Sequence, residues 1–339
     1  MIRRTLLAVS LLLWVAAASA QTGSPNGDLT STRPNAGGAP DEITVLVGLL
    51  DIAGIDNREQ LFKVDIFVEV EWRDPRLAVG DDATEDLRTF AVGEIWSPRL
   101  LVVNDRGLDV LLPQVATVDR QGNVIARQRL AGPLAVDLEL RDFPFDTQRL
   151  PIEVVSYQYD PSEIVFSGDS ELVARLDDLS GEGWTYTALE PEPMVYRLKD
   201  DGRGGSGITF SLSAERKAAY YIFTLALPMT LILFLAWMSH WLPVHVIPPR
   251  MGMASATVFS LIAFGVSFRL SLPKIAYLTD ADRFVLYATL LVLVSLAVAV
   301  ATSRWASTDR EEAAELLARR ARIAFPFLYA LIVLLTFTT

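Results

Sequence analysis

Four long apolar runs in the last third of this 339-residue chain limit most strongly what it can fold into. Each run is long enough to cross all or most of a bilayer as a helix, and arginines beside the shortest run anchor it at the membrane surface. The sequence therefore predicts a transmembrane bundle of four helices. The expected helices are residues 218–241, 249–270, 282–305 and 322–338.

The preceding segment, residues 41–216, has a different period. Apolar residues alternate with polar ones from Phe62 to Trp72, and the pattern returns at Leu134–Leu140, Leu150–Val154 and Ile208–Leu212. Alternating segments separated by Pro, Gly and Asp turns indicate strands with one buried face, and a series of them predicts an antiparallel β-sandwich. The expected fold class is thus α+β: a periplasmic antiparallel β-sandwich followed by the transmembrane bundle, residues 217–339.

The N-terminus has the features of an export signal. Residues 1–20 combine two early arginines, an apolar stretch and the small residues Ala18, Ser19 and Ala20, which predict a cleaved signal peptide. An uncleaved first membrane helix is the less favoured alternative, because the apolar stretch is short. Residues 21–40 are rich in Gly, Pro, Ser, Thr and Asn, and we expect them to form a disordered leader.

Basic residues predict the orientation in the membrane. The link between the third and fourth runs contains five arginines, so it should lie in the cytoplasm, and residues 311–322 should form a short amphipathic helix there. Four spans then leave the sandwich and the C-terminus on the other side. The sequence predicts a multi-pass protein of the bacterial inner (plasma) membrane with a periplasmic N-terminal domain.

Several function classes are disfavoured by composition. The chain has no cysteine and two histidines, which excludes thiol catalysis and most zinc sites, and it contains no phosphate-binding glycine loop, catalytic-serine motif or HExxH pattern. The net charge of -11 argues against a nucleic-acid partner, since phosphate binding needs clustered Lys and Arg. We expect no enzyme activity, no cofactor and no metal site.

The second apolar run is unusual because small and weakly polar residues occur throughout it. Six positions spaced by four and three residues lie on one stripe of a helix. Copies of this stripe around an axis would form an apolar tube with a constriction at Phe259, a kind of pore that gates by dewetting. Tight helix packing through small residues explains the pattern equally well. The candidate pore-lining residues are Gly252, Ala256, Phe259, Ala263, Val266 and Leu270.

Six short motifs occur in an informative order along the chain. They are Trp72-Arg73-Asp74, Trp96-Ser97-Pro98, Phe143-Pro144-Phe145-Asp146, Arg216, Leu227-Pro228 and Leu272-Pro273-Lys274. In these motifs the chain resembles the prokaryotic pentameric ligand-gated ion channels of the Cys-loop receptor superfamily, from about Glu42 to the C-terminus. The loop cysteines of the animal receptors correspond to Val136 and Leu150, so apolar packing should replace the crosslink.

The resemblance implies a homopentamer in which an agonist binds between adjacent sandwiches and opens a pore lined by the second helix. It also implies a coupling interface in which Asp146 pairs with Arg216 and the first hairpin loop touches the segment after the second helix. The implied coupling residues are Asp56, Asn57, Phe143, Pro144, Phe145, Asp146, Arg216, Leu272, Pro273, Lys274 and Tyr277.

The resemblance leaves the agonist open. The implied ligand-binding residues are Phe67, Tyr157, Tyr196 and Phe210. Two positions of the family's aromatic box for amines are Val103 and Val155, and an incomplete box binds a quaternary amine poorly. Acid-gated relatives have a pore-helix histidine where this chain has Leu261 and an acidic residue where it has Gln60, which argues against protons.

Ion selectivity follows from the start of the second helix. Pro248, Pro249 and Arg250 resemble the entrance of the anion-selective glycine and GABA receptors, where Arg250 would form a cationic ring, and Arg269 adds a charge at the outer end. The alternative is that Arg250 is a positive-inside anchor turned away from the pore. No Asp or Glu occurs between Glu215 and Asp280. We therefore expect a chloride channel, with a cation-selective channel of the same family and a non-conducting periplasmic sensor as alternatives. Its expected partners are further copies of itself, membrane lipid, a small-molecule agonist and permeating inorganic ions.

Overall fold

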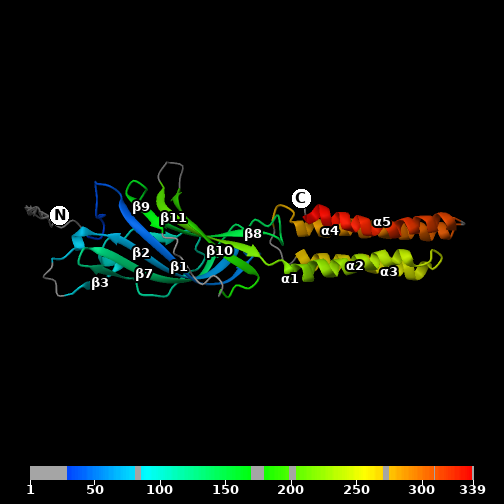
Figure 1. The fold of residues 1–339 in the computed structure, drawn as a ribbon, viewed down its shortest axis with the longest axis horizontal. Helices are drawn as coiled ribbons and strands as arrows, with labels where there is room; N and C mark the ends of the chain where they lie inside the picture. The colour runs from blue at the N-terminus through cyan, green and yellow to red at the C-terminus, as the bar shows by residue number, and fades with distance from the viewer. Residues whose placement is uncertain are drawn as a thin grey trace, which may run out of the picture.

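The computed structural model describes residues 29–80, 85–168, 179–197, 204–269, 275–308 and 310–337. An elongated molecule results, with a β domain at one end and long helices at the other (Figure 1). The signal peptide expected at residues 1–20 lies outside the described residues, as does the first part of the expected leader, residues 21–28.

Within the described residues the β domain consists of two sheets. The larger has the strand order β3–β6–β7–β2–β1–β9, with the short β5 paired to β7; the smaller has the order β10–β11–β8–β4. The strands of the larger sheet are β1 (Asp41–Asp56), β2 (Leu61–Arg73), β3 (Leu87–Ala91), β5 (Asp109–Val110), β6 (Val115–Asp119), β7 (Asn123–Ala135) and β9 (Ile164–Gly168). Those of the smaller sheet are β4 (Leu100–Val102), β8 (Thr147–Ser156), β10 (Trp184–Tyr196) and β11 (Gly205–Arg216).

The predicted β-sandwich is confirmed, and its strands pair antiparallel except at one edge. β9 pairs with β1 in parallel, starting with Asp41 opposite Ile164. The chain leaves β8 in the smaller sheet and crosses to the larger sheet before β9 begins, and there β9 runs in the same direction as β1. The sandwich therefore contains one mixed sheet.

Alternating side chains of both sheets form the core of the sandwich. The series from Phe62 to Trp72 is buried at every second position, as are Ile208, Phe210 and Leu212 on β11. Val136 and Leu150 both belong to this core. Among the polar groups in it, Trp96 Nε1 donates to the Tyr159 hydroxyl at 2.8 Å, whereas Trp72 Nε1 is buried without a hydrogen-bond partner among the described residues.

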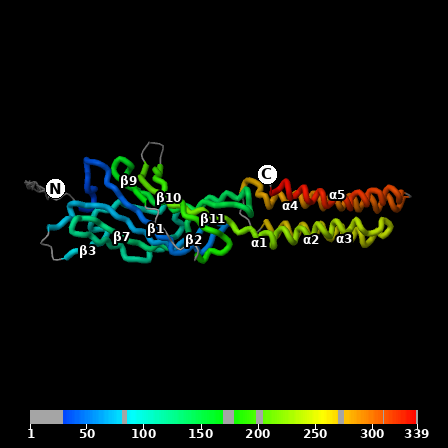
Figure 2. The backbone as a smooth tube through the Cα atoms, in the orientation of Figure 1, coloured from blue at the N-terminus to red at the C-terminus, as the bar shows by residue number. Residues whose placement is uncertain are grey.

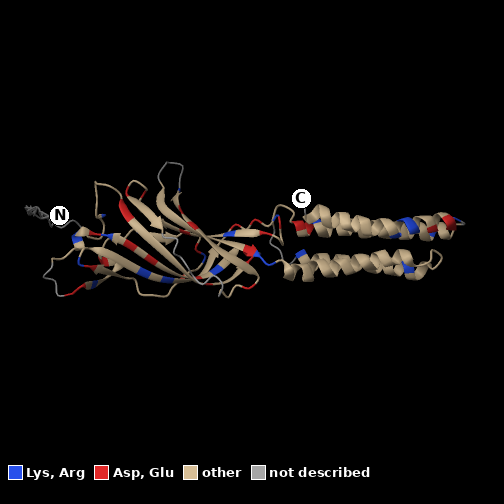
Figure 3. Cartoon of the chain, in the orientation of Figure 1, with Lys and Arg blue, Asp and Glu red and all other residues tan. Residues whose placement is uncertain are grey.

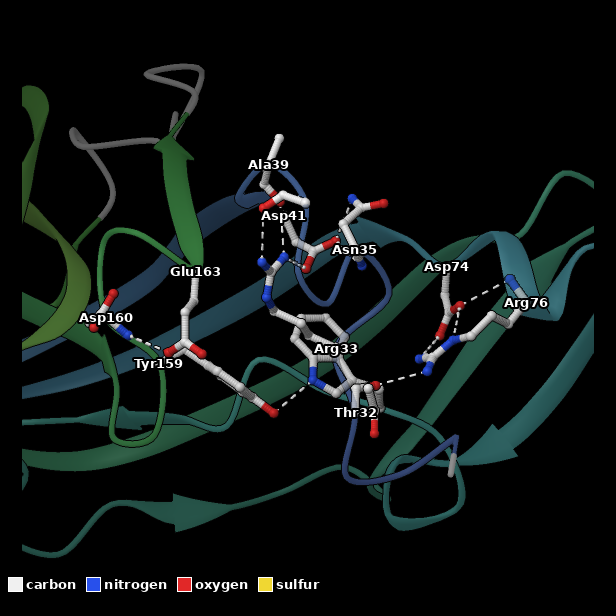
Figure 4. Close-up of polar contacts among 12 residues, drawn as sticks. Thr32, Arg33, Asn35, Ala39, Asp41, Asp74, Arg76, Tyr159, Asp160 and Glu163 are labelled. Atoms are coloured by element: carbon white, nitrogen blue, oxygen red, sulfur yellow. Dashed lines mark hydrogen bonds and ion pairs between the residues drawn. The ribbon is translucent and has the colours of Figure 1, made fainter. Parts of the chain in front are cut away.

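The described part of the expected disordered leader, residues 29–40, instead lies against the sandwich. Arg33 is buried, pairs with Asp41 at 2.9 Å and donates to the carbonyl of Ala39 at the same distance (Figure 4). Arg76, itself paired with Asp74, donates to the carbonyl of Thr32 at 2.8 Å. Composition alone does not reveal these contacts, because they depend on single side chains in an otherwise polar segment.

Four helices long and apolar enough to cross a membrane follow β11 in the described part of the chain. The first, Ala219–Trp241, is made of α1 (Ala219–Tyr221), a π-helical turn, α2 (Leu227–Met238) and a final 3₁₀ turn. The other three are α3 (Ile247–Arg269), α4 (Asp280–Ala306) and α5 (Glu311–Phe337). Charged residues gather near the helix ends (Figure 3), and the helices run side by side away from the sandwich (Figure 2). This arrangement fits a multi-pass membrane protein.

α5 is one continuous helix, so the separate amphipathic helix expected at residues 311–322 is absent from the described chain. Pro326 lies inside α5 and cannot donate to the carbonyl of Arg322, four residues earlier. The indole Nε1 of Trp237 donates to that carbonyl at 2.9 Å. A neighbouring helix therefore satisfies the group that the proline leaves free, and the helix continues.

Candidate functional site at the domain boundary and on α3

A buried ion pair joins the two domains. Arg216 at the end of β11 donates from Nε to Asp146 Oδ1 at 2.7 Å and from Nη2 to Oδ2 at 2.9 Å, and both side chains are 2% exposed. A bidentate pair of this kind is geometrically specific and strong. Asp146 also accepts a hydrogen bond from Gln148, and Arg216 donates a third bond to Asn57 in the β1–β2 loop at 3.1 Å.

Aromatic rings enclose the guanidinium. The Arg216 Cζ lies 4.0 Å from the ring centroid of Trp184, 4.9 Å from that of Phe143 and 5.5 Å from that of Tyr221. Tyr221 belongs to α1, so the cation contacts the first membrane helix as well as the sandwich. Cation–π contacts of this kind gain strength where water is excluded.

The loop that carries Asp146 also contacts the other helices. The amide of Asp280 donates to the carbonyl of Arg141 at 2.8 Å, and the amide of Ala281 donates to that of Phe143 at 3.2 Å. The ring of Phe145 lies 5.5 Å from the ring of Phe337 near the end of α5. One loop, including Pro144, thus touches α4 and α5 while Arg216 connects it to α1.

The other predicted coupling residues have different surroundings. The hydroxyl of Tyr277 accepts a hydrogen bond from the backbone amide of Leu140, just before the same loop, at 3.0 Å. The carboxylate of Asp56 accepts hydrogen bonds from the backbone amides of Arg58 and Glu59 in its own turn. Within the described residues Asp56 therefore caps this turn. Leu272, Pro273 and Lys274 lie outside the described residues, as does Leu270 of the candidate stripe.

A cavity of about 400 Å³ opens beside this junction. Its walls come from the β1–β2 loop, the Asp146 loop, the first membrane helix and the upper end of α3; they include Asn57, Phe143, Tyr221, Phe264 and Phe268. α3 and three side chains that contact Arg216, those of Asn57, Phe143 and Tyr221, therefore border the same space.

The described members of the candidate stripe all lie exposed along α3. Phe259 is 72% exposed, and Val266 is exposed about two turns further along. The face of α3 that packs into the subunit is a second series with steps of four, three and four. Its members are Arg250, Ala254, Thr257 and Leu261. The exposed stripe, on the opposite side, consists of Gly252, Ala256, Phe259, Ala263 and Val266.

Arg250 belongs to the packed face of α3 and not to the exposed stripe. Its side chain is 0% exposed, whereas Pro248 and Pro249 before it are exposed. The physical reason is the helical phase, because a residue two positions before Gly252 is rotated by about 200° from it. Arg269, at the other end of α3, is exposed.

The predicted agonist-binding aromatics divide into two groups. Tyr157 is 58% exposed, and Phe67 and Tyr196 are half-buried, so all three have accessible ring surface. Phe67 lies on the outer face of β2, between residues that form ion pairs with β7. Phe210 does not belong with them: it is 3% exposed and packs in the core, because it shares the phase of Ile208 and Leu212.

Sequence reasoning missed two residues of the junction: Trp184 and Tyr221. Trp184 lies opposite Arg216 in the β10–β11 register, so a correct strand alignment would have paired them. Tyr221 lies five residues after Arg216, across the change from β11 to α1, so no single period relates the two. Gln148, two residues after Asp146, makes two hydrogen bonds to the backbone of Glu139.

Comparison with known proteins agrees with this architecture. The family model described as "Neurotransmitter-gated ion-channel ligand binding domain" matches residues 29–190, and the model described as "Neurotransmitter-gated ion-channel transmembrane region" matches residues 225–333. The chain is also similar to a protein named "Proton-gated ion channel" from Gloeobacter violaceus. The two are 29% identical over 342 residues, covering 96% of this chain and 93% of the relative. The two domains, the junction between them and these similarities show that the chain belongs to the prokaryotic pentameric ligand-gated ion channels, within the Cys-loop receptor superfamily.

Proposed function

We propose that five copies of this chain enclose a pore lined by the exposed stripe of α3. Members of this family are ligand-gated channels and not enzymes. The observation that carries the proposal is the division of α3 into a packed face and an opposite face of small residues with one aromatic ring. A single helix cannot surround a pore, so the stripe needs further copies of the chain around a common axis.

The proposed trigger is a small-molecule agonist bound between adjacent sandwiches. Phe67, Tyr157 and Tyr196 support it because their rings remain accessible in a single subunit. The similar protein from Gloeobacter is named for gating by protons, but two features of this chain argue against the same trigger. Leu261 is buried and apolar, and the amide of Gln60 does not titrate and is bonded to Leu138 and Asn57.

We further propose that the pore prefers chloride. With Arg250 on the packed face, the proposal depends on Arg269, which is exposed beside the stripe, and on the absence of acidic residues between Glu215 and Asp280. Positive rings in a low-dielectric constriction favour anions. Charge on the acidic sandwich lies farther away and is screened over a Debye length of about 8 Å at physiological salt.

The proposed location is the bacterial inner membrane, with the sandwich in the periplasm. Arg304 in the last turn of α4 and Arg319 and Arg320 in the first half of α5 support this orientation, since all three are exposed. Basic residues of this kind are retained on the cytoplasmic side of a bilayer.

Patch recording from liposomes that contain the full purified chain tests these proposals. Acid steps and a panel of small candidate agonists should separate gating by protons from gating by an organic ligand.

In a NaCl gradient the reversal potential should lie toward the chloride equilibrium potential. Arg269→Gln should move it toward zero, whereas Arg320→Gln, a matched change on exposed α5, should leave it in place. A wild-type reversal near the sodium potential would establish the cation-selective alternative, and silence under every condition would favour the sensor.

A further inference from the structure

Arg99, in the turn before β4, has a backbone conformation that few residues other than glycine adopt. Its φ angle is 54°, in the left-handed region, where the Cβ of an L-residue crowds the backbone. Among the described residues that are not glycine, only Gln60 shares a positive φ. A turn of this kind is unfavourable by itself, so contacts elsewhere have to hold Arg99 in it.

The backbone of this turn supports the Tyr157 loop. The carbonyl of Arg99 accepts a hydrogen bond from the amide of Tyr157 at 3.1 Å. The carbonyl of Pro98 accepts one from the buried hydroxyl of Ser156 at 2.7 Å, and Leu100 pairs with Ser156 where β4 meets β8. If the Arg99 backbone left the left-handed region, its carbonyl would turn away from the amide of Tyr157.

Close packing contributes little to holding Tyr157 in place. The residue is 58% exposed. A cavity of about 370 Å³ borders both Tyr157 and the turn, and its walls include Trp72, Pro98, Arg99 and Leu100. Because Tyr157 has solvent and a cavity beside it, the position of its loop depends mainly on the hydrogen bonds to the turn.

The side chain of Arg99 reaches the N-terminal leader. Its Nη2 atom donates to the carbonyl of Thr30 at 3.3 Å. The leader is fixed on both sides of this contact, since Leu29 packs against the sandwich core and the carbonyl of Thr32 accepts a bond from Arg76 at 2.8 Å. The leader therefore holds the Arg99 side chain from outside the Tyr157 loop.

We propose that the leader positions Tyr157 for the agonist through Arg99, which keeps its left-handed turn while its side chain is bonded to the leader. This inference rests on the proposed agonist site, to which Tyr157 contributes an accessible ring. A docked leader keeps the Arg99 carbonyl on the Tyr157 amide. Release of the leader lets the turn relax and the loop move, which weakens agonist binding.

Amide hydrogen exchange of the full chain in detergent tests this link without an agonist. Deletion of residues 25–32 keeps the expected signal peptide and Arg33 but removes the contact at Thr30. It should speed exchange at the Tyr157 amide by about tenfold or more, because that hydrogen bond opens more often. Arg99→Ala should have the same effect, since alanine loses the bond to the leader and keeps the unfavourable φ.

Arg99→Gly separates positioning from general stabilisation. Glycine adopts the left-handed region without strain, so Tyr157 exchange should stay near the wild-type rate and no longer respond to the leader deletion. Arg106→Ala, at an exposed arginine of the next loop, should also exchange as wild type does. Equal acceleration in Arg99→Ala and Arg99→Gly would overturn the proposal, as would no acceleration in Arg99→Ala. If the deletion fails to fold, the Arg99 variants still decide.

Current recording adds the functional readout, with the first panel compound that opens the wild-type channel as the probe. The leader deletion and Arg99→Ala should raise its half-activating concentration several-fold without changing the single-channel conductance, and Arg99→Gly should restore the wild-type value. An unchanged half-activating concentration despite faster exchange would overturn the link to the agonist. A panel without an active compound would contradict the proposed trigger, whereas the exchange rates would still decide whether the leader positions Tyr157.

Discussion

Arg216 and Arg250 are both buried arginines, and they differ in what surrounds them. Arg216 has a bidentate carboxylate, an amide oxygen and three aromatic rings around it. Arg250 has hydrogen-bond donors without acceptors in the described chain. The first guanidinium is therefore satisfied by the fold itself, whereas the donors of the second are not satisfied within the described part of the subunit.

The consequence for Asp146 and Arg216 is strong energetic coupling. Asp146→Asn should destabilise the subunit by about 3–5 kcal/mol, because it leaves a buried cation without its counter-charge. The double variant Asp146→Asn/Arg216→Gln should cost clearly less than the sum of the two single variants. Denaturant unfolding in detergent measures all three, and agonist-evoked current in the single variants should be lost.

A matched control is Arg129→Gln, which removes an exposed ion pair with Asp65 and should change stability by less than about 1 kcal/mol. Additive costs at Asp146 and Arg216 would show that the two side chains act independently. Normal activation in both single variants would show that the pair only stabilises the junction.

For single residues, the sequence predicted contacts between side chains better than it predicted which face of a helix or strand a residue occupies. The Asp146–Arg216 pair came from matching motifs, and the structure shows it in bidentate form. Arg250 and Phe210 were also assigned from motif positions, but the periodicity of their own segments places both on packed faces. The aromatic frame of Arg216 could not be read from the sequence because it requires the β10–β11 register.

Among the elements, α3 carries the most functional information. Its exposed stripe has Phe259 as its bulky aromatic member, and a ring of such residues is expected to exclude water from a narrow pore. Phe259→Ser should wet the constriction and raise the spontaneous open probability. Single-channel recording without agonist measures this effect.

Val258→Ser is the control for that variant, because Val258 is half-buried against the subunit core one residue earlier. It should change stability without raising spontaneous opening. If Phe259→Ser opens less readily than wild type, the stripe does not face the pore.

Element types were predictable where the periodicity was long and regular. The period-two strands and the four apolar helices follow from the side chains that have to be buried or lipid-facing, and this part of the expectation is confirmed. The parallel pairing of β9 depends on which sheet the chain crosses to, which no local pattern specifies. The continuity of α5 through Pro326 depends on Trp237 from another helix.

For the whole molecule, the central prediction is assembly. The full chain in mild detergent should give a native mass of five subunits, since the exposed stripe of α3 needs partner copies and the family is pentameric. Crosslinking followed by denaturing electrophoresis provides an independent count. A population made only of monomers and dimers would contradict the proposed pore.

The C-terminal end of α5 connects the surrounding lipid to the Asp146 loop at the domain boundary. Nearly the whole length of α5 is exposed on the subunit surface, and its Phe337 touches Phe145 in the Asp146 loop and Phe284 in α4. A bilayer that is thicker or thinner than the apolar length of a helix changes the tilt of that helix. Acyl-chain length should therefore shift the agonist sensitivity of this channel, and Phe337→Ala should reduce that shift by removing the ring through which α5 meets the loop.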